Sequence, residues 1–113
     1  MSLVGNLLYG SGSRLAEFDD RVLAHLKVVI VAKLRREEKF TFSWASPTGD
    51  GRHTVWVHPA IELHFEFAEN VRPQLNRAWV EQMMVTANNG ELTITPEPNL
   101  SDEAPTGRQA SRT

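Results

Sequence analysis

The segment from Lys39 to Phe67 constrains the fold most, because three short runs in it alternate apolar and polar residues. The runs are Lys-Phe-Thr-Phe-Ser-Trp-Ala, Arg-His-Thr-Val-Trp-Val-His and Ile-Glu-Leu-His-Phe-Glu-Phe, separated by a Gly-rich turn and a Pro-Ala corner. Alternation at every second residue is typical of β-strands with one buried face. We therefore expect an antiparallel meander of three strands.

The parity of the apolar residues predicts how these strands pair. One face carries Phe40, Phe42, Trp44, Val55, Val57, Ile61, Leu63, Phe65 and Phe67. A slip of one residue turns every side chain of a strand over, so a shared buried face restricts the register. This register brings polar side chains of the second and third strands opposite one another, in the pairs Trp56 with His64, His58 with Glu62, and Thr54 with Glu66.

Two helices are predicted outside the meander. The first follows Asp19-Asp20 and ends near Arg36, so its charges suit the helix dipole. Its apolar stripe, at helical spacing, comprises Val22, Leu23, Leu26, Val29, Ile30 and Leu34. His25 is interpreted as a residue on the flank of this helix. The second helix is expected over 74–88, with Asn76 as a capping residue near its start and Asn88-Asn89-Gly90 as its stop.

Short strands are expected at both ends of the domain. Gly10-Ser11-Gly12-Ser13 joins two apolar runs and predicts a hairpin, because a phosphate-binding loop would need a lysine and a Ser/Thr after its last glycine. Residues 91–95 alternate as a last strand. The fold class is therefore α+β, an antiparallel sheet of hairpin, meander and last strand with two helices packed on one face. We expect residues 1–95 to form a single domain and 96–113 to be a disordered tail.

The composition excludes several classes of protein. The chain has 113 residues, no cysteine and a net charge of -2. Disulfide and thiol chemistry are therefore absent, and the charge gives no general attraction to nucleic acid or anionic lipid. No apolar run reaches the length of a membrane span, and the start lacks the basic flank of a signal peptide. We expect a cytoplasmic protein.

Two surfaces are candidates for protein contacts. Ala24, Val28 and Val31 lie on the first helix opposite its apolar stripe, and a helix that is apolar on two sides is usually covered twice. The cover is either the N-terminal hairpin or a second subunit. Trp56 lies on the polar face of the meander, where it either marks a contact surface or packs beneath the tail or a loop.

Metal binding is a further hypothesis for the polar face. His58, Glu62, His64 and Glu66 would share that face, and two imidazoles with two carboxylates can hold zinc or another divalent ion. Ordinary cross-strand pairing of histidine with glutamate is the alternative.

A basic cluster between the first helix and the meander is a candidate for contacts with nucleic acid. It comprises Lys33, Arg35, Arg36 and Lys39. A basic face is the minimum footprint for binding phosphates. Glu37 and Glu38 lie within the cluster, however, and the dipole of the first helix accounts for most of it.

Several segments resemble a family of small actinobacterial proteins of unknown function. They are Leu7-Leu8-Tyr9-Gly10-Ser11, residues 19–36, Phe42-Ser43-Trp44, Trp56-Val57-His58-Pro59, Leu75-Asn76-Arg77-Ala78-Trp79 and Pro96-Glu97-Pro98. Members of that family are often labelled automatically as ATP-dependent DNA ligase. Such ligases attach AMP to the lysine of a Lys-x-Asp-Gly motif. This chain has no such motif, so the resemblance implies no catalytic residue here.

The sequence therefore favours a non-catalytic interaction module, homodimeric and without a cofactor. The order of its expected elements also resembles that of small secretion-chaperone-like domains, which dimerise and bind partner proteins. One alternative is an accessory of DNA ligation that binds nucleic acid through the basic cluster. The other is a metal-dependent enzyme on the face of His58 and His64.

Overall fold

The computed structural model describes residues 3–10, 13–46 and 48–99 of the chain. In sequence order the elements are β1 (Val4–Tyr9), β2 (Ser13–Asp19), α1 (Asp20–Arg35), β3 (Phe40–Ala45), β4 (Arg52–Val57), β5 (Leu63–Glu66), α2 (Arg77–Asn88) and β6 (Glu91–Thr93). No helix in this described part is long and apolar enough to cross a membrane. The predicted α+β class is confirmed.

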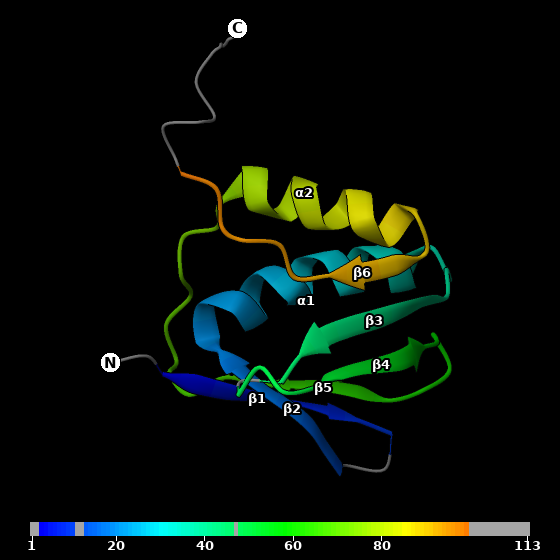
Figure 1. Cartoon of the computed structure of the whole chain (residues 1–113), viewed down its shortest axis with the longest axis horizontal. Coiled ribbons are helices and arrows are strands. Elements are labelled where there is room, and N and C mark those ends of the chain that lie inside the picture. The colour runs from blue at the N-terminus through cyan, green and yellow to red at the C-terminus, as the bar shows by residue number, and fades with distance from the viewer. Residues whose placement is uncertain (1–2, 11–12, 47, 100–113) are drawn as a thin grey trace, which may run out of the picture.

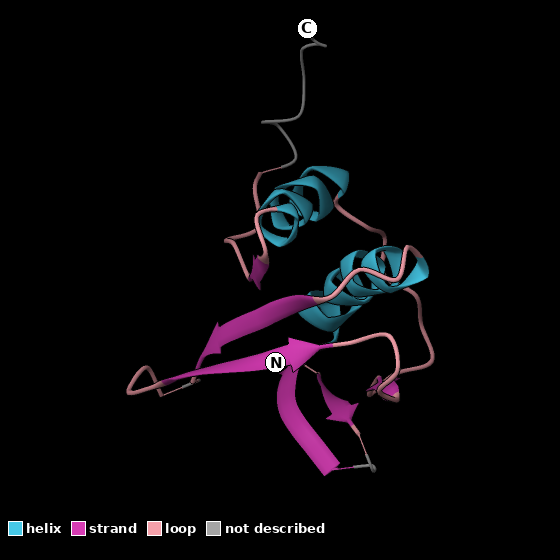
Figure 2. Ribbon diagram, turned by 90° about the vertical axis from the view of Figure 1, so that its right-hand side faces the viewer, coloured by secondary structure: helices cyan, strands magenta, loops and turns pink. Residues whose placement is uncertain are grey.

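The strands form two sheets of three strands each, rather than one continuous sheet. The first sheet has the order β2-β1-β5 and the second the order β4-β3-β6. All pairs are antiparallel except β3 with β6. The N-terminal hairpin is confirmed as β1 and β2, and both helices lie on one side of the strands (Figures 1 and 2).

The meander is confirmed for its first two strands and wrong for its third. β3 and β4 pair in the predicted register, with Phe40 opposite Val57 and Phe42 opposite Val55. β5 pairs instead with β1 in the other sheet. The proposed cross-strand pairs of Trp56 with His64, His58 with Glu62 and Thr54 with Glu66 therefore do not form.

The physical reason lies in the corner after β4. Residues 58–61 form a turn in which the Ile61 N–H donates to the His58 carbonyl at 3.1 Å, and the chain leaves the second sheet there. Ile61, predicted to be buried, is exposed. Alternation identifies the two faces of a strand but not its neighbouring strand, and Phe65 is partly buried opposite Leu7 of β1.

The last strand also pairs differently from the prediction. β6 ends at Thr93 and lies parallel to β3, with Leu92 opposite Phe42. The chain reaches this edge by running back from the end of α2 through Gly90, whose φ of +104° is a conformation that suits glycine. The predicted stop of the second helix at Asn88-Asn89-Gly90 is thus confirmed, and β3 becomes the central strand of its sheet.

The core lies between the helices and the inner faces of both sheets. Its buried members are Leu7, Phe18, Leu23, Leu26, Val29, Ile30, Phe40, Phe42, Val57, Trp79, Met83, Ala87 and Leu92. Phe18 of the first sheet contacts Phe42 and Trp44 of the second, with ring centroids 6.0 and 5.9 Å apart. One continuous apolar cluster therefore holds the two sheets together.

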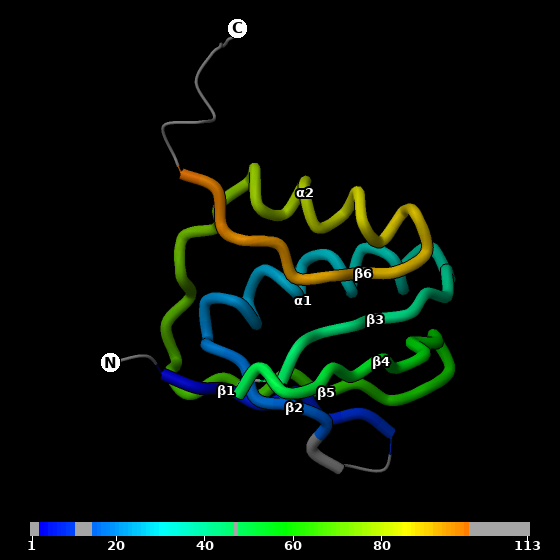
Figure 3. The backbone as a smooth tube through the Cα atoms, in the orientation of Figure 1, coloured from blue at the N-terminus to red at the C-terminus, as the bar shows by residue number. Residues whose placement is uncertain are grey.

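The second helix begins later than predicted, at Arg77 rather than at residue 74. Asn76 is the N-cap, and its Oδ1 accepts a hydrogen bond from the Trp79 N–H at 3.3 Å. Residues 67–76 run in an extended path from β5 to α2, and Figure 3 shows them on the same side of the molecule as the segment after β6. These two segments, both beside the start of α1, form the surroundings of the candidate site.

Candidate functional site

An apolar hollow lies between α1 and residues 67–75, and we call it the α1 groove. Its volume is about 330 Å³, and its apolar lining includes Ala24 and Val28 of α1. Phe67, Val71 and Leu75 line it from the other side. Ala24 and Val28, two residues of the second apolar side of the first helix, are therefore bordered by a segment of the same chain.

The rim of the α1 groove is both exposed and charged. Val71 is 69% exposed and Leu75 is 46% exposed, although both side chains are apolar. Lys27 and Arg72 bring positive charge to the rim and Glu69 brings negative charge. The Lys27 ammonium group lies 5.8 Å from the centroid of the Phe67 ring. The surface therefore presents an apolar hollow, apolar projections and charges of both signs together.

Asp20 anchors one end of the groove wall. Its carboxylate accepts hydrogen bonds from the backbone N–H of Ala68 at 3.0 Å and of Glu69 at 3.1 Å. Asp20 lies in the first turn of α1. A carboxylate that receives backbone N–H groups fixes a segment without secondary structure, because those donors would otherwise need water.

His25 anchors the other end of the wall. Its Nε2 lies 2.8 Å from the Asn76 backbone nitrogen, and its Nδ1 lies 2.7 Å from the Arg21 carbonyl oxygen. A backbone N–H only donates and a carbonyl only accepts, so Nδ1 carries the proton and Nε2 accepts. The imidazole is completely buried and packs on the Trp79 ring with centroids 4.5 Å apart. The interpretation of His25 as a residue on the helix flank is wrong.

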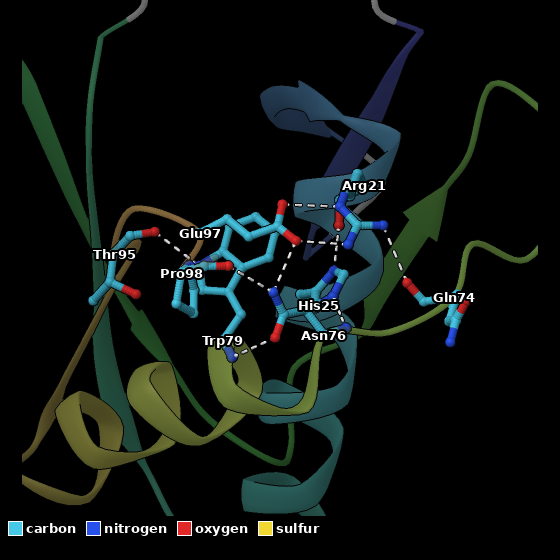
Figure 4. Close-up of polar contacts among 8 residues, drawn as sticks. All are labelled: Arg21, His25, Gln74, Asn76, Trp79, Thr95, Glu97 and Pro98. Carbon is cyan, nitrogen blue, oxygen red and sulfur yellow. Dashed lines mark hydrogen bonds and ion pairs between the residues drawn. The ribbon is translucent and has the colours of Figure 1, made fainter. Parts of the chain in front are cut away.

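A second set of contacts ties the chain after β6 to the same point (Figure 4). The Glu97 carboxylate accepts from Arg21 Nε at 2.9 Å and Nη2 at 2.6 Å, and from Asn76 Nδ2 at 3.0 Å. Asn76 Nδ2 also donates to the Pro98 carbonyl at 3.0 Å, and Trp79 Nε1 donates to the Thr95 carbonyl at 2.8 Å. We call Arg21, His25, Asn76 and Glu97 the polar clamp.

The electrostatics of the polar clamp favour a neutral histidine and an ionised glutamate. Burial lowers the pKa of His25, and the Arg21 guanidinium lowers it further, while the hydrogen bond to the Arg21 carbonyl and the charge of Glu97 act in the opposite direction. Hydrogen bonds from Arg21 hold the pKa of Glu97 at about 2, with a smaller contribution from Asn76. At neutral pH the clamp therefore contains one ion pair and one neutral imidazole.

The residues predicted as metal ligands are divided among the corner after β4, the position before β5 and β5 itself. His58 is at the corner after β4, where its Nδ1 accepts from the Ala60 N–H at 3.0 Å. His64 and Glu66 belong to β5, and Glu66 accepts from Asn6 Nδ2 at 3.0 Å. Within the described ranges, no three His, Asp or Glu side chains are grouped as a metal site would require. Glu62 precedes β5, and its carbonyl accepts from the Gly10 N–H.

The basic cluster is partly neutralised by its own neighbours. Lys33 is buried, and its Nζ lies 2.7 Å from Glu38 Oε1 and 3.0 Å from Asn88 Oδ1. Arg36 lies 3.7 Å from the other Glu38 oxygen. Arg35 and Lys39 are exposed. Lys33 therefore joins the ends of the two helices.

The remaining candidates for protein contacts lie apart from one another. Trp56 is 54% exposed on β4, opposite Thr41, and its carbonyl accepts a hydrogen bond from the Tyr9 hydroxyl. Val31 is half-buried and does not line the α1 groove. Trp56 thus stands on the outer face of the second sheet, among polar residues.

Sequence reasoning missed the polar clamp because its members are far apart in the chain. The capping role predicted for Asn76 is confirmed, and this was the one local signal of the clamp. Glu97 falls in the segment predicted as a tail, yet it is described and bound to Arg21, whereas residues 100–113 lie outside the described part. The sequence offered one signal for burial of His25. It lies next to Leu26 and two residues from Leu23, on a helix with a broad buried side.

Comparison with known proteins identifies the family without assigning an activity. A search of curated proteins and a search of solved structures find no match. A protein-family model matches residues 4–97, a span that runs from the start of β1 to Glu97 of the polar clamp. The chain therefore belongs to the family described as a domain of unknown function, DUF7882.

Proposed function

We propose that this protein is a non-catalytic interaction module that forms a homodimer through the α1 groove. The observation that carries the proposal is the apolar hollow of about 330 Å³ with two exposed apolar side chains, Val71 and Leu75, on its rim. Exposed apolar patches on a folded domain mark contact surfaces more often than isolated apolar residues do.

The arrangement suits two copies of the same chain. In a dimer with twofold symmetry, each copy presents the same patch, so a projection on one must fit a hollow on the other. Val71 and the α1 groove supply such a projection and such a hollow side by side. Across the same axis, Lys27 and Arg72 of one copy can meet Glu69 of the other, which makes the charges self-complementary.

The oligomeric state tests this proposal. At about 100 µM, a concentration that populates a dimer with a micromolar Kd, sedimentation velocity should show a dimer. Val71→Asp should give a monomer, because it places a charge in an apolar contact. Val85→Asp is the matched control: Val85 is 60% exposed on α2 and does not line the groove. A wild-type monomer at this concentration, or a Val71→Asp variant that still dimerises, would refute the proposal.

A further inference from the structure

His25 can gain a second proton by a single route. Nδ1 already carries the proton that it donates to the Arg21 carbonyl. The second proton must bind Nε2, which is the atom that accepts the hydrogen bond from the Asn76 N–H at 2.8 Å. Two N–H groups cannot face each other at that distance, because both are donors. Protonation of His25 therefore breaks its contact with Asn76.

Asn76 is the point at which three parts of the chain meet. Its side chain caps α2 through Trp79, and it also donates to Glu97 and to the Pro98 carbonyl. Two residues before Asn76, the Gln74 carbonyl accepts a hydrogen bond from Arg21 Nη1 at 3.1 Å. Displacement of Asn76 from His25 consequently loosens both the end of the groove wall and the segment 95–98.

The charged groups around His25 come from two elements with opposite effects. Arg21, on its own helix, disfavours the imidazolium, and Glu97, from the segment after β6, favours it. Asn76 and Trp79 contribute uncharged groups from the start of α2. Because burial acts most strongly and lowers the pKa of His25, the neutral form predominates at neutral pH and the charged form requires acid.

The strand pairing of both sheets does not involve His25 or Asn76. The first sheet is held by β1 with β2 and β5, and the second by β3 with β4 and β6. The other end of the groove wall is held by Asp20 through the backbone N–H groups of Ala68 and Glu69. Local opening at one end of a wall that stays attached at the other costs less than global unfolding.

We propose that His25 is a proton-operated latch, in which protonation of Nε2 detaches Asn76 and releases residues 74–76 and 95–98 from α1 while both sheets stay folded. The opened wall changes the shape of the α1 groove. Acid thereby weakens the homodimer, a consequence that rests on the function proposed above. The latch itself is a property of the single chain.

Amide hydrogen exchange on the full chain tests the latch directly. The Asn76 amide donates to His25 Nε2 and the Trp79 amide to Asn76 Oδ1. After correction for intrinsic exchange rates, these two amides should lose protection at least tenfold more than amides of β1 and β3 between pH 7.5 and pH 5. An equal loss in all these amides would overturn the proposal, because it would show global destabilisation. Unchanged protection of the Asn76 amide at pH 5, with His25 protonated, would also overturn it.

Two variants separate His25 from the other histidines. His25→Gln removes the titrating group, so exchange of the Asn76 amide should become independent of pH over this range. His64→Gln is the matched control, since His64 is exposed on β5 and its replacement should leave the pH dependence intact. If His25→Gln retained the wild-type pH dependence, or if His64→Gln abolished it, the latch would be disproved.

A measurement on the wild type covers the case in which His25→Gln does not fold. NMR of the ¹⁵N-labelled imidazole should show the proton of neutral His25 on Nδ1, and its titration midpoint should coincide with the loss of Asn76 amide protection. A proton on Nε2 in the neutral form, or two separate midpoints, would contradict the latch. A wild type that is monomeric at every pH would refute the dimer alone, whereas protected segments at pH 5 would refute the latch alone.

Discussion

Replacement of Gly5 by alanine should destabilise the protein more than any other single methyl addition at a described glycine. Gly5 lies in β1, and a Cβ built on it would approach the Glu66 carbonyl oxygen to 2.5 Å. It would also lie 2.8 Å from Asp20 Oδ1 and 2.9 Å from Leu23 Cδ2. Real Cβ atoms essentially never show contacts under 3.0 Å, so these groups must move.

The size of the effect follows from what has to move. The Glu66 oxygen belongs to the backbone of β5, so β1 and β5 must separate locally, and one ladder hydrogen bond is worth about 1 kcal/mol. Overpacking against the buried Leu23 side chain adds about 2 kcal/mol. The sum, about 3 kcal/mol, corresponds to a fall in Tm of roughly 12–24 °C for a domain of this size.

Urea denaturation followed by circular dichroism measures this loss. Gly51→Ala is the control, because its Cβ would meet only the Ser46 hydroxyl, at 3.4 Å, and we expect a change below about 0.5 kcal/mol. A Gly5→Ala variant within about 1 kcal/mol of wild type would refute the reasoning, because it would mean that β1 and β5 approach less closely than the structure shows.

Three further predictions concern the polar clamp and the core, all measured as the free energy of unfolding in urea. Glu97→Gln should lose about 1 kcal/mol at pH 7, after allowance for solvent screening of a partly exposed pair. Because the folded pKa of about 2 lies below the ordinary 4.5, this contribution is complete above pH 4.5 and is lost as pH falls towards 2; a difference from wild type that persists at pH 2 would contradict it. Asn76→Ala should lose about 2 kcal/mol through the helix cap, and a loss under 0.5 kcal/mol would show that the cap is dispensable. Phe42→Ala should lose about 4 kcal/mol because Phe42 is fully buried, whereas Trp56→Ala should lose under 1 kcal/mol; equal losses would contradict the assigned burial.

The elements that could be predicted from sequence are those with a local physical cause. The first helix has a broad apolar stripe with acidic residues before it and basic residues at its end, and it forms over Asp20–Arg35 as expected. β3 and β4 pair as predicted because the turn between them is short and both have one apolar face. The hairpin of β1 and β2 follows for the same reason. In each case the interacting residues are close in sequence.

The elements that could not be predicted depend on partners distant in the chain. β5 alternates as well as β4 does, but nothing in its residues states that it pairs with β1, more than fifty residues earlier. No local sequence pattern indicates that β6 pairs in parallel with β3 either. The candidate site shares this property. Arg21 and Glu97 form an ion pair although they are 76 residues apart in the sequence. In the sequence alone, each of them has the pattern of an ordinary charged surface residue.

The parallel pairing of β3 with β6 has a consequence for biosynthesis. During translation, β3 and β4 emerge from the ribosome well before β6, so the nascent second sheet has an open edge along β3 until the segment 91–93 arrives. That edge carries Phe42, which Leu92 later covers, and an uncovered apolar strand edge invites pairing with other chains. Nascent chains stalled between α2 and β6 should therefore recruit chaperones, and release of the stall should end that requirement.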